Sequence, residues 1–416
     1  MNSMPSEETP PANALRAIQK QLASDVVPAR NLGSFVTTQM EAEAEQVMID
    51  AWNKNLINYE SYPATTDMHT RCLNMIANLF HAPLQGSADA VGTSTVGSSE
   101  AILLAVLAMR KRWVAKRKGA GKDYSRPNLI MSSAVQVCWK KAARYFDIEE
   151  RYIYCSKQRN TIDPQRAVDL VNENTIGICS ILGTTYTGEY EDTKAINDLL
   201  VERELDVPIH VDAASGGFVA PFLHPDLVWD FQLEQVASIN VSGHKYGLVY
   251  AGIGWAIWRS AEYLPQDLIF KHHYLGTEQS SFNLNFSRSA SHVICQYYNL
   301  IRLGKHGYRR IMTQLADTAE YLTSNLEQTK CFEVMSGKAP GLPLVVFRLD
   351  PSQEYPFDEY ALAEELLRNG WMVPAYTMAP HNEESKILRV VVRQDLSRLD
   401  CDALVATLRR AIHQLS

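Results

Sequence analysis

The feature that most constrains the fold of this chain is a regular alternation of short apolar runs and amphipathic stretches between residues 91 and 259. The strand-like runs are Val91–Val96, Asn128–Met131, Tyr152–Tyr154, Ile176–Leu182, Ile209–Val211 and Gly252–Arg259. Stretches with helical spacing lie between them, at 102–107, 136–146, 165–174 and 193–204. Alternation of this kind predicts a mostly parallel sheet that helices cover on both faces. The expected fold class is therefore α/β.

The end of the chain has a different organisation. A long helical stretch begins at Ser289 and is interrupted near Gly304 and Gly307. Strand, helix, strand and helix then follow at 344–348, 360–368, 388–392 and 401–415. We therefore expect three parts: an N-terminal arm and helix at 1–50, a large α/β domain at 51–310 and a small α+β domain at 311–416. Near the N-terminus, helices are expected at 12–23, 40–54 and 71–81, with a loop at 61–66.

Composition argues against several classes of protein. The net charge is −7 and the basic residues are scattered, so a nucleic-acid partner is not expected. No apolar run approaches the roughly 18 residues that a membrane-spanning helix needs. Seven cysteines without a CxxC or Cys/His pairing argue against both a disulfide framework and a metal site. Reduced thiols and an acidic N-terminus without secretory features predict a cytoplasmic protein.

Two charged residues follow strand-like runs in the second half of the large domain. Asp212 ends an apolar run that begins at Pro208, and Lys245 follows a small, hydroxyl-rich turn within Ser238–Tyr246. Taken alone, they are an ordinary strand-end carboxylate and an ordinary loop lysine. Together they are what pyridoxal phosphate chemistry requires. The lysine must be deprotonated to form a Schiff base, and the carboxylate must keep the pyridine nitrogen protonated.

A third motif precedes these two in the chain. Gly97-Ser98-Ser99-Glu100 opens a helix after a strand-like run. Free amides at a helix N-terminus together with two hydroxyls suit a phosphate, and the ordinary alternative is a serine N-cap. The absence of a Walker loop or a GxGxxG fingerprint disfavours nucleoside triphosphates and dinucleotides. A phosphate cup, then Asp212, then Lys245 is the serial order of a fold-type-I pyridoxal phosphate enzyme.

Longer motifs carry a family resemblance. The chain closely resembles glutamate decarboxylases, within the group II pyridoxal phosphate-dependent decarboxylases, at His210–Phe222, Val241–Gly247, Asn285–Arg288, Gly92–Ala101 and Thr185–Glu191. These matches occur in the same order along the chain, and the resemblance extends from about residue 31 to residue 393. It implies fold type I, pyridoxal 5'-phosphate as cofactor and a small C-terminal domain.

The resemblance also implies roles for individual residues. The implied catalytic residues are Lys245, which would form the Schiff base, Asp212, which would pair with the pyridinium nitrogen, Gln136, which would lie over the ring face, and Arg389, which would take the substrate α-carboxylate. A surface arginine on a strand is the alternative for Arg389. The implied cofactor-binding residues are Ser98, Ser99, Gln136, Thr185, Asp212, His244, Lys245 and, from the neighbouring subunit, Ser287.

The side-chain pocket departs from the family pattern. The implied substrate-binding residues are Ser34, Phe35, Asn55 and Asn58, where glutamate decarboxylases have a Thr-Phe pair, an asparagine and an aspartate. Ser34 keeps a hydroxyl group, but Asn58 lacks the family's charge. A site built on hydrogen bonds discriminates strongly, so this change is compatible either with glutamate or with an uncharged or modified amino acid.

The expected function is the α-decarboxylation of an L-amino acid, with L-glutamate giving 4-aminobutanoate and CO2 as the leading case. Three alternatives stay open: a decarboxylase of another amino acid, another fold-type-I reaction such as aminotransfer or carbon–carbon cleavage, and a catalytically silent dimeric binding module. The expected assembly is a homodimer with shared active sites, in which Ser287 and the Ser34–Asn58 region complete the partner's site. A higher oligomer is also possible.

Overall fold

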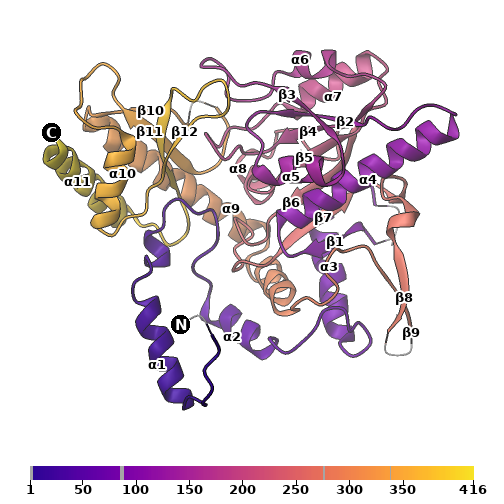
Figure 1. Cartoon of the computed structure of the whole chain (residues 1–416), viewed down its shortest axis with the longest axis horizontal. Helices are drawn as coiled ribbons and strands as arrows, with labels where there is room; N and C mark the ends of the chain where they lie inside the picture. Colours follow the sequence, from indigo (N-terminus) through magenta and orange to yellow (C-terminus); the bar gives the residue numbers. More distant parts are fainter. Residues whose placement is uncertain (1–2, 85–88, 275–276, 338) are drawn as a thin grey trace.

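A computed structural model describes residues 3–84, 89–274, 277–337 and 339–416; residues 1–2 of the predicted arm lie outside this range. Within the described residues the strands form a seven-stranded sheet, a four-stranded sheet and a two-stranded hairpin. Figure 1 shows the large sheet at one end of the molecule and the small one at the other, with helix α9 (Ser291–Gln328) between them. The division at residues 50 and 310 stays a prediction, and α9 crosses the second of these positions.

The large sheet has the strand order β1-β7-β6-β5-β4-β2-β3. Its strands are β1 (Val91–Thr95), β2 (Asn128–Ser132), β3 (Glu149–Ile153), β4 (Thr175–Ile181), β5 (Ile209–Asp212), β6 (Val236–Val241) and β7 (Gly254–Trp258). Neighbouring strands run parallel except at β7, which is antiparallel to both β1 and β6. The predicted α/β class with a mostly parallel sheet is confirmed.

Helices cover both faces of this sheet, because successive side chains of a buried strand point to opposite faces. On β2, Leu129 and Met131 pack with α4 and α5, whereas Ile130 joins the core on the other face with α6 and α7. The helices around the sheet are α3 (Pro63–Leu79), α4 (Ser98–Gly119), α5 (Val137–Tyr145), α6 (Pro164–Asp169), α7 (Thr193–Glu202) and α8 (Ala220–Leu223). Single 3₁₀ turns occur at Gly216–Phe218, Ala261–Tyr263 and Gln266–Leu268.

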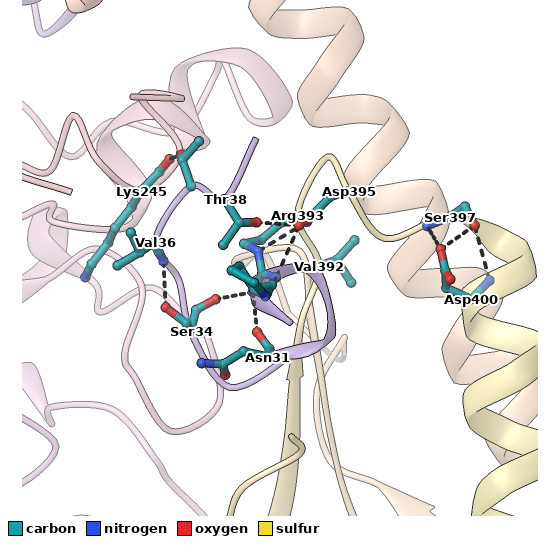
Figure 2. A network of polar contacts seen from close by, with 12 residues as sticks. Asn31, Ser34, Val36, Thr38, Lys245, Val392, Arg393, Asp395, Ser397 and Asp400 are labelled. Atoms are coloured by element: carbon teal, nitrogen blue, oxygen red, sulfur yellow. Dashed lines mark hydrogen bonds and ion pairs between the residues drawn. The ribbon is translucent and has the colours of Figure 1, made fainter. Parts of the chain in front are cut away.

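The C-terminal part is an antiparallel sheet with the order β10-β11-β13-β12. Its elements are β10 (Phe332–Val334), β11 (Leu344–Leu349), α10 (Glu359–Arg368), β12 (Ala375–Thr377), β13 (Lys386–Val391) and α11 (Arg398–Leu415). Helix α11 begins with a capping box, in which Ser397 and Asp400 satisfy each other's backbone amides (Figure 2). The predicted interruption of α9 lies at Gly304, whose φ of 54° and ψ of −173° are not helical.

The N-terminal part consists of α1 (Pro11–Leu22), the 3₁₀ turn Pro28–Arg30 and α2 (Ala42–Asp50). Helix α1 lies at the edge of the molecule (Figure 1) and has no buried residue. Residues 28–38, which we call the N-terminal strap, connect the two sheets. At one end Val391 N–H donates to the carbonyl oxygen of Leu32 at 2.8 Å, and at the other Thr37 N–H donates to that of His244 at 2.9 Å.

Two sequence-based predictions of local structure were wrong, and one element was missed. The helix expected at 40–54 is shorter and spans Ala42–Asp50. The expected loop at 61–66 instead contains the start of α3, because Pro63 stands at the first helical position, where its missing N–H costs nothing. The hairpin of β8 (Phe270–Tyr274) and β9 (Thr277–Ser281) was not predicted.

Two structural facts bear on the cell compartment. All seven cysteines are free thiols. Among the residues that the structure describes, no helix is both long and apolar enough to span a bilayer.

A buried carboxyl beside the end of β4 yields a prediction for pH-dependent stability. Glu191 is 3% exposed and accepts hydrogen bonds from the amides of Ile162 at 2.9 Å and Ile181 at 2.8 Å. Burial raises its pKa from 4.5 to about 7. Between these values the folded chain binds more protons than the unfolded chain, so this carboxyl lowers stability as pH rises through the window.

We expect Glu191→Gln, which cannot ionise, to gain stability relative to the wild type by up to about 3 kcal/mol between pH 5 and pH 8. Urea unfolding at fixed protein and cofactor concentration measures the difference. Glu189→Gln, which changes a half-buried carboxylate two residues away, is the matched control. Parallel pH profiles for wild type and Glu191→Gln would contradict this assignment.

Candidate active site

A cavity of about 330 Å³ lies at the carboxyl ends of the parallel strands, where ligands bind in open α/β sheets. Ile181 and Asp212 stand at the ends of β4 and β5, and the turn after β6 contributes Ser242, His244 and Lys245. Seven of the predicted site residues line this cavity: Ser98, Ser99, Gln136, Thr185, Asp212, His244 and Lys245. Residues as far apart in the sequence as Ser98 and Lys245, which are 147 positions apart, thus line the same cavity.

Asp212 is a buried acidic residue of the site, with 5% of its surface exposed. Trp139 Nε1 donates to its Oδ2 at 2.7 Å, and Asn240 Nδ2 and the backbone amide of Ala214 each donate to its Oδ1 at 3.1 Å. A buried carboxylate is tolerated when its oxygens accept hydrogen bonds in this way. The three donors fix the direction of the carboxylate and stabilise its ionised form.

A second layer of hydrogen bonds lies behind Asp212. His210 Nε2 is 2.7 Å from Asn240 Oδ1, and its Nδ1 is 2.7 Å from Ser238 Oγ. Because an amide oxygen only accepts, Nε2 carries the proton and Nδ1 accepts from the serine hydroxyl. Burial lowers the pKa of His210, in keeping with this neutral form. The layer orients Asn240 so that its amide group points toward Asp212.

Lys245 extends into the cavity from the turn after β6. Its Nζ donates to Ser215 Oγ at 2.9 Å and lies 5.3 Å from the centre of the Phe35 ring. Burial lowers the pKa of Lys245, and the positive charge of Arg389 acts in the same direction. A lowered pKa increases the fraction of the neutral amine, which is the nucleophilic form.

The first turn of α4 forms the opposite end of the cavity. Gly97 precedes it with a φ of 156°, and no side chain caps the helix amides. Ser98 Oγ is 2.6 Å from Ser242 Oγ, and Ser99 is exposed. His244 Nδ1 is buried and has no partner among the described residues, and burial lowers the pKa of this ring to about 4. Free amides, hydroxyls and an unpaired imidazole nitrogen suit an anion.

Gln136 caps α5 with its own side chain. Its Oε1 accepts from the amide of Cys138 at 2.6 Å, and the residue lines the cavity. Glutamine is not one of the residues that usually cap a helix. The bond holds the side chain at the cavity wall, and the role over a cofactor ring stays a prediction.

Arg389, on β13, lies beside the cavity and does not line it. Its Nη2 donates to the carbonyl oxygen of Gly33 at 2.7 Å, its Nη1 donates to that of Thr185, and its Nε is buried without a partner among the described residues. The guanidinium carbon is 4.7 Å from the centre of the Phe35 ring. Phe35 therefore lies beside Lys245 and Arg389 of its own chain, and its predicted part in completing the partner's active site stays a prediction.

The remaining predicted residues lie elsewhere. Ser34 Oγ accepts from the amide of Val36 at 3.1 Å, within the strap. Asn55 Nδ2 donates to Ser287 Oγ at 3.2 Å, so these two residues form a group of their own. Asn58 Oδ1 is buried without a partner among the described residues. The described residues that line the cavity do not include Ser34, Asn55, Asn58 or Ser287.

Comparison with known proteins interprets this arrangement. Residues 5–350 match the family model described as the pyridoxal-dependent decarboxylase conserved domain.

The chain belongs to this family.

Individual relatives of this decarboxylase support the assignment. Glutamate decarboxylase of Petunia hybrida is 49% identical over 416 residues, which are 99% of this chain and 83% of the relative. Glutamate decarboxylase of Aliivibrio fischeri is 42% identical, over 98% of this chain and 88% of its own. A solved glutamate decarboxylase of Lactobacillus brevis superposes with a TM-score of 0.95 at 40% identity, over 100% of this chain and 95% of that one. The predicted family and fold type I are confirmed.

The residues of the cavity fit pyridoxal phosphate, the cofactor of this decarboxylase. Asp212 offers a buried, oriented carboxylate of the kind that a protonated ring nitrogen requires. Lys245 offers an amine whose pKa is lowered. The uncapped start of α4 and the unpaired nitrogen of His244 suit the phosphate group.

Sequence reasoning missed three residues that organise the site: Trp139, Ser215 and Asn240. Trp139 and Asn240 act on Asp212, and Ser215 accepts from Lys245. The position of Asn240 could have been inferred from the pairing of β5 with β6, since the register places Asn240 beside Asp212. The position of Trp139 could not, because its contact joins the side of a helix to the end of a distant strand.

Proposed function

We propose that the protein decarboxylates L-glutamate to 4-aminobutanoate and CO2. The observation that carries this proposal is the convergence of Lys245, Asp212 and the uncapped start of α4 on one cavity. Relatives that cover nearly all of the chain, at 42–50% identity, are glutamate decarboxylases, which favours glutamate over other amino acids. Intact Lys245, Asp212 and Arg389 argue against a catalytically silent binding module.

The residues divide the work in this proposal. When bound, pyridoxal phosphate supplies an electron sink for the pair released when the Cα–carboxylate bond breaks. Lys245 holds the cofactor through Nζ, and Asp212 holds the proton on the ring nitrogen. The start of α4, with Ser98, Ser99 and His244, binds the phosphate group. These groups are in place before the reaction, so they stabilise developing charge without reorganisation.

In this proposal the substrate is contacted by residues that lie near Lys245. Arg389 would take the α-carboxylate, and its buried, unpartnered Nε is a donor available for this purpose. Phe35 lies beside both Arg389 and Lys245, and in this proposal its ring keeps water away from them. Gln136 and Thr185 contribute the remaining polar groups at the cavity wall. Removing water strengthens every charged interaction at the bond that breaks.

A homodimer with shared active sites is part of the proposal. Ser287, Asn55 and Asn58 lie away from the cavity of their own chain, and the buried oxygen of Asn58 has no partner among the described residues. In the dimer, Ser287 would reach the partner's cofactor phosphate, and the two asparagines would reach the distal group of its substrate. We also propose a cytoplasmic location, which the seven free cysteines support.

The test is a product assay on the purified protein with pyridoxal phosphate. L-glutamate, L-aspartate, L-glutamine and a panel of apolar and aromatic amino acids are supplied separately, and products are identified by mass. We expect kcat/KM for glutamate to exceed that for aspartate by at least about 100-fold. Asn58→Asp, which restores the charge found in the family, is expected to keep this preference and to change KM for glutamate by less than about tenfold. Asn53→Asp, at an exposed position nearby, is the matched control.

Two other outcomes are decisive. Loss of CO2 from another amino acid, with glutamate inert, would favour the alternative decarboxylase with an altered side-chain pocket. Conversion without CO2 release, or no visible cofactor absorption at all, would favour another fold-type-I reaction or the binding module respectively.

A further inference from the structure

One buried arginine binds the backbone of the N-terminal strap. Arg393 lies two residues after the end of β13 and is 5% exposed. Its Nη1 donates to the carbonyl oxygens of Asn31 at 2.6 Å and Ser34 at 2.7 Å, and its Nη2 donates to that of Pro28 at 3.1 Å (Figure 2). Its Nε is 3.3 Å from Asp395 Oδ1, which neutralises the charge. One guanidinium group thus binds three backbone carbonyl groups of the strap.

The same pair is connected to the catalytic turn. Asp395 Oδ2 accepts a hydrogen bond from Thr38 Oγ1, so both members of the ion pair contact the strap (Figure 2). The neighbouring Thr37 donates from Oγ1 to the carbonyl oxygen of Lys245 at 2.7 Å. A continuous set of contacts therefore runs from Arg393 through the strap to the backbone of Lys245.

Phe35 is the part of the strap that this arrangement places in the site. It lies between the carbonyl of Ser34, which Arg393 binds, and Thr37. Its ring centre is 5.3 Å from Lys245 Nζ and 4.7 Å from the guanidinium carbon of Arg389. Both groups lie within the distance range of cation–π contacts, so a displaced ring would change the surroundings of the Lys245 amine and of the Arg389 guanidinium.

We propose that Arg393, paired with Asp395, is a positioning residue of the active site. It holds the strap so that Phe35 stays beside Lys245 and Arg389, and it thereby controls the binding of the amino acid without touching it. The inference rests on the proposed decarboxylation at this site and adds a specificity-determining element to it. The planar fork of an arginine is needed, because a lysine is a point charge that cannot bind three carbonyl groups in this fixed geometry.

The test compares Arg393→Lys with wild type as holoenzyme. We expect KM for the amino acid substrate to rise by about tenfold or more, while cofactor affinity changes by less than about threefold. Arg348→Lys is the matched control, because Arg348 also lies in the small sheet and forms an ion pair with Glu333, but does not contact the strap. It should keep the wild-type KM.

A second readout does not depend on activity. Arg30 is exposed and lies within the strap, so trypsin can cut after it only when the strap opens locally. In the protein without substrate, we expect cleavage after Arg30 to be about tenfold faster or more in Arg393→Lys than in wild type or Arg348→Lys, with fragments identified by mass. If Arg393→Lys fails to fold, Thr38→Val takes its place, because it removes only the contact with Asp395. It should raise KM and the rate of cleavage after Arg30 in the same direction, but to a smaller degree.

Faster cleavage together with a raised KM supports the positioning role. Wild-type cleavage in Arg393→Lys would overturn it, since the strap would then be fixed without the guanidinium fork. Faster cleavage with an unchanged KM would also overturn it, because opening the strap would not affect substrate binding. If the wild type forms no amine from any amino acid, the proposed function fails, whereas the cleavage comparison still decides whether Arg393 holds the strap.

Discussion

Replacing Lys245 with alanine is expected to lower kcat by at least about 10⁴-fold, the largest effect of any single change in this chain. Lys245 is the cavity's amine with a lowered pKa, and the proposal gives it both the attachment of the cofactor and its recovery after each turnover. The cavity residues to which the proposal assigns the phosphate and the ring nitrogen are untouched. The variant should therefore still bind pyridoxal phosphate, but without a covalent link.

Mass spectrometry after borohydride reduction checks this directly, together with steady-state rates. Wild type should gain the mass of one reduced cofactor per chain, and Lys245→Ala should gain none. Lys111→Ala is the control, because this lysine is on α4 and pairs with Asp267 at the surface. A variant that keeps more than about a tenth of the activity, or that is still labelled, would show that another amine does this work.

Replacing Asp212 with asparagine is expected to lower kcat by about 10² to 10³-fold, the range seen when a preorganised electrostatic group is removed from an active site. The asparagine keeps the shape of the side chain but has no charge to hold a proton on the ring nitrogen. Its amide group would also meet the donors of Trp139 and Asn240, so one buried contact becomes donor against donor.

The design separates these two effects. Asp230→Asn changes another buried carboxylate of the same domain, outside the cavity, and reports what loss of a buried charge does to stability alone. A cofactor whose ring nitrogen carries a permanent methyl group is positively charged without Asp212. It should raise the activity of Asp212→Asn by about tenfold or more. A variant with near-wild-type kcat would contradict the role given to Asp212.

How much of this site was predictable depends on how each residue acts. Asp212 ends β5 and Lys245 lies in the turn after β6, and neighbouring parallel strands place their carboxyl ends together, so sequence order was enough to join them. Trp139, Ser215 and Asn240 act by orienting those two residues. Their contacts depend on side-chain directions that no spacing rule specifies.

The N-terminal part shows a different limit. The polar segment at 61–66 was predicted to be a loop, yet Pro63 in it begins a helix, because proline is favoured both in loops and at the first helical position. The strap has no periodic pattern, and its structure comes from Arg393 and Val391, which lie more than 350 residues away in the sequence. Only the folded chain reveals that Phe35 meets Lys245 of the same subunit.

The hydrogen bond between the strap and β13 has a consequence for folding during synthesis on the ribosome. Leu32 is synthesised before every strand of the seven-stranded sheet, and its partner Val391 is synthesised after all of them. Domains fold as they emerge, N-terminal first, so the seven-stranded sheet can form well before β13 is made. The strap must wait, without its partner strand, until β13 has been made. Assembly of the substrate-binding wall is therefore a late event, and a nascent chain can have its cofactor cavity before it has the wall that faces it.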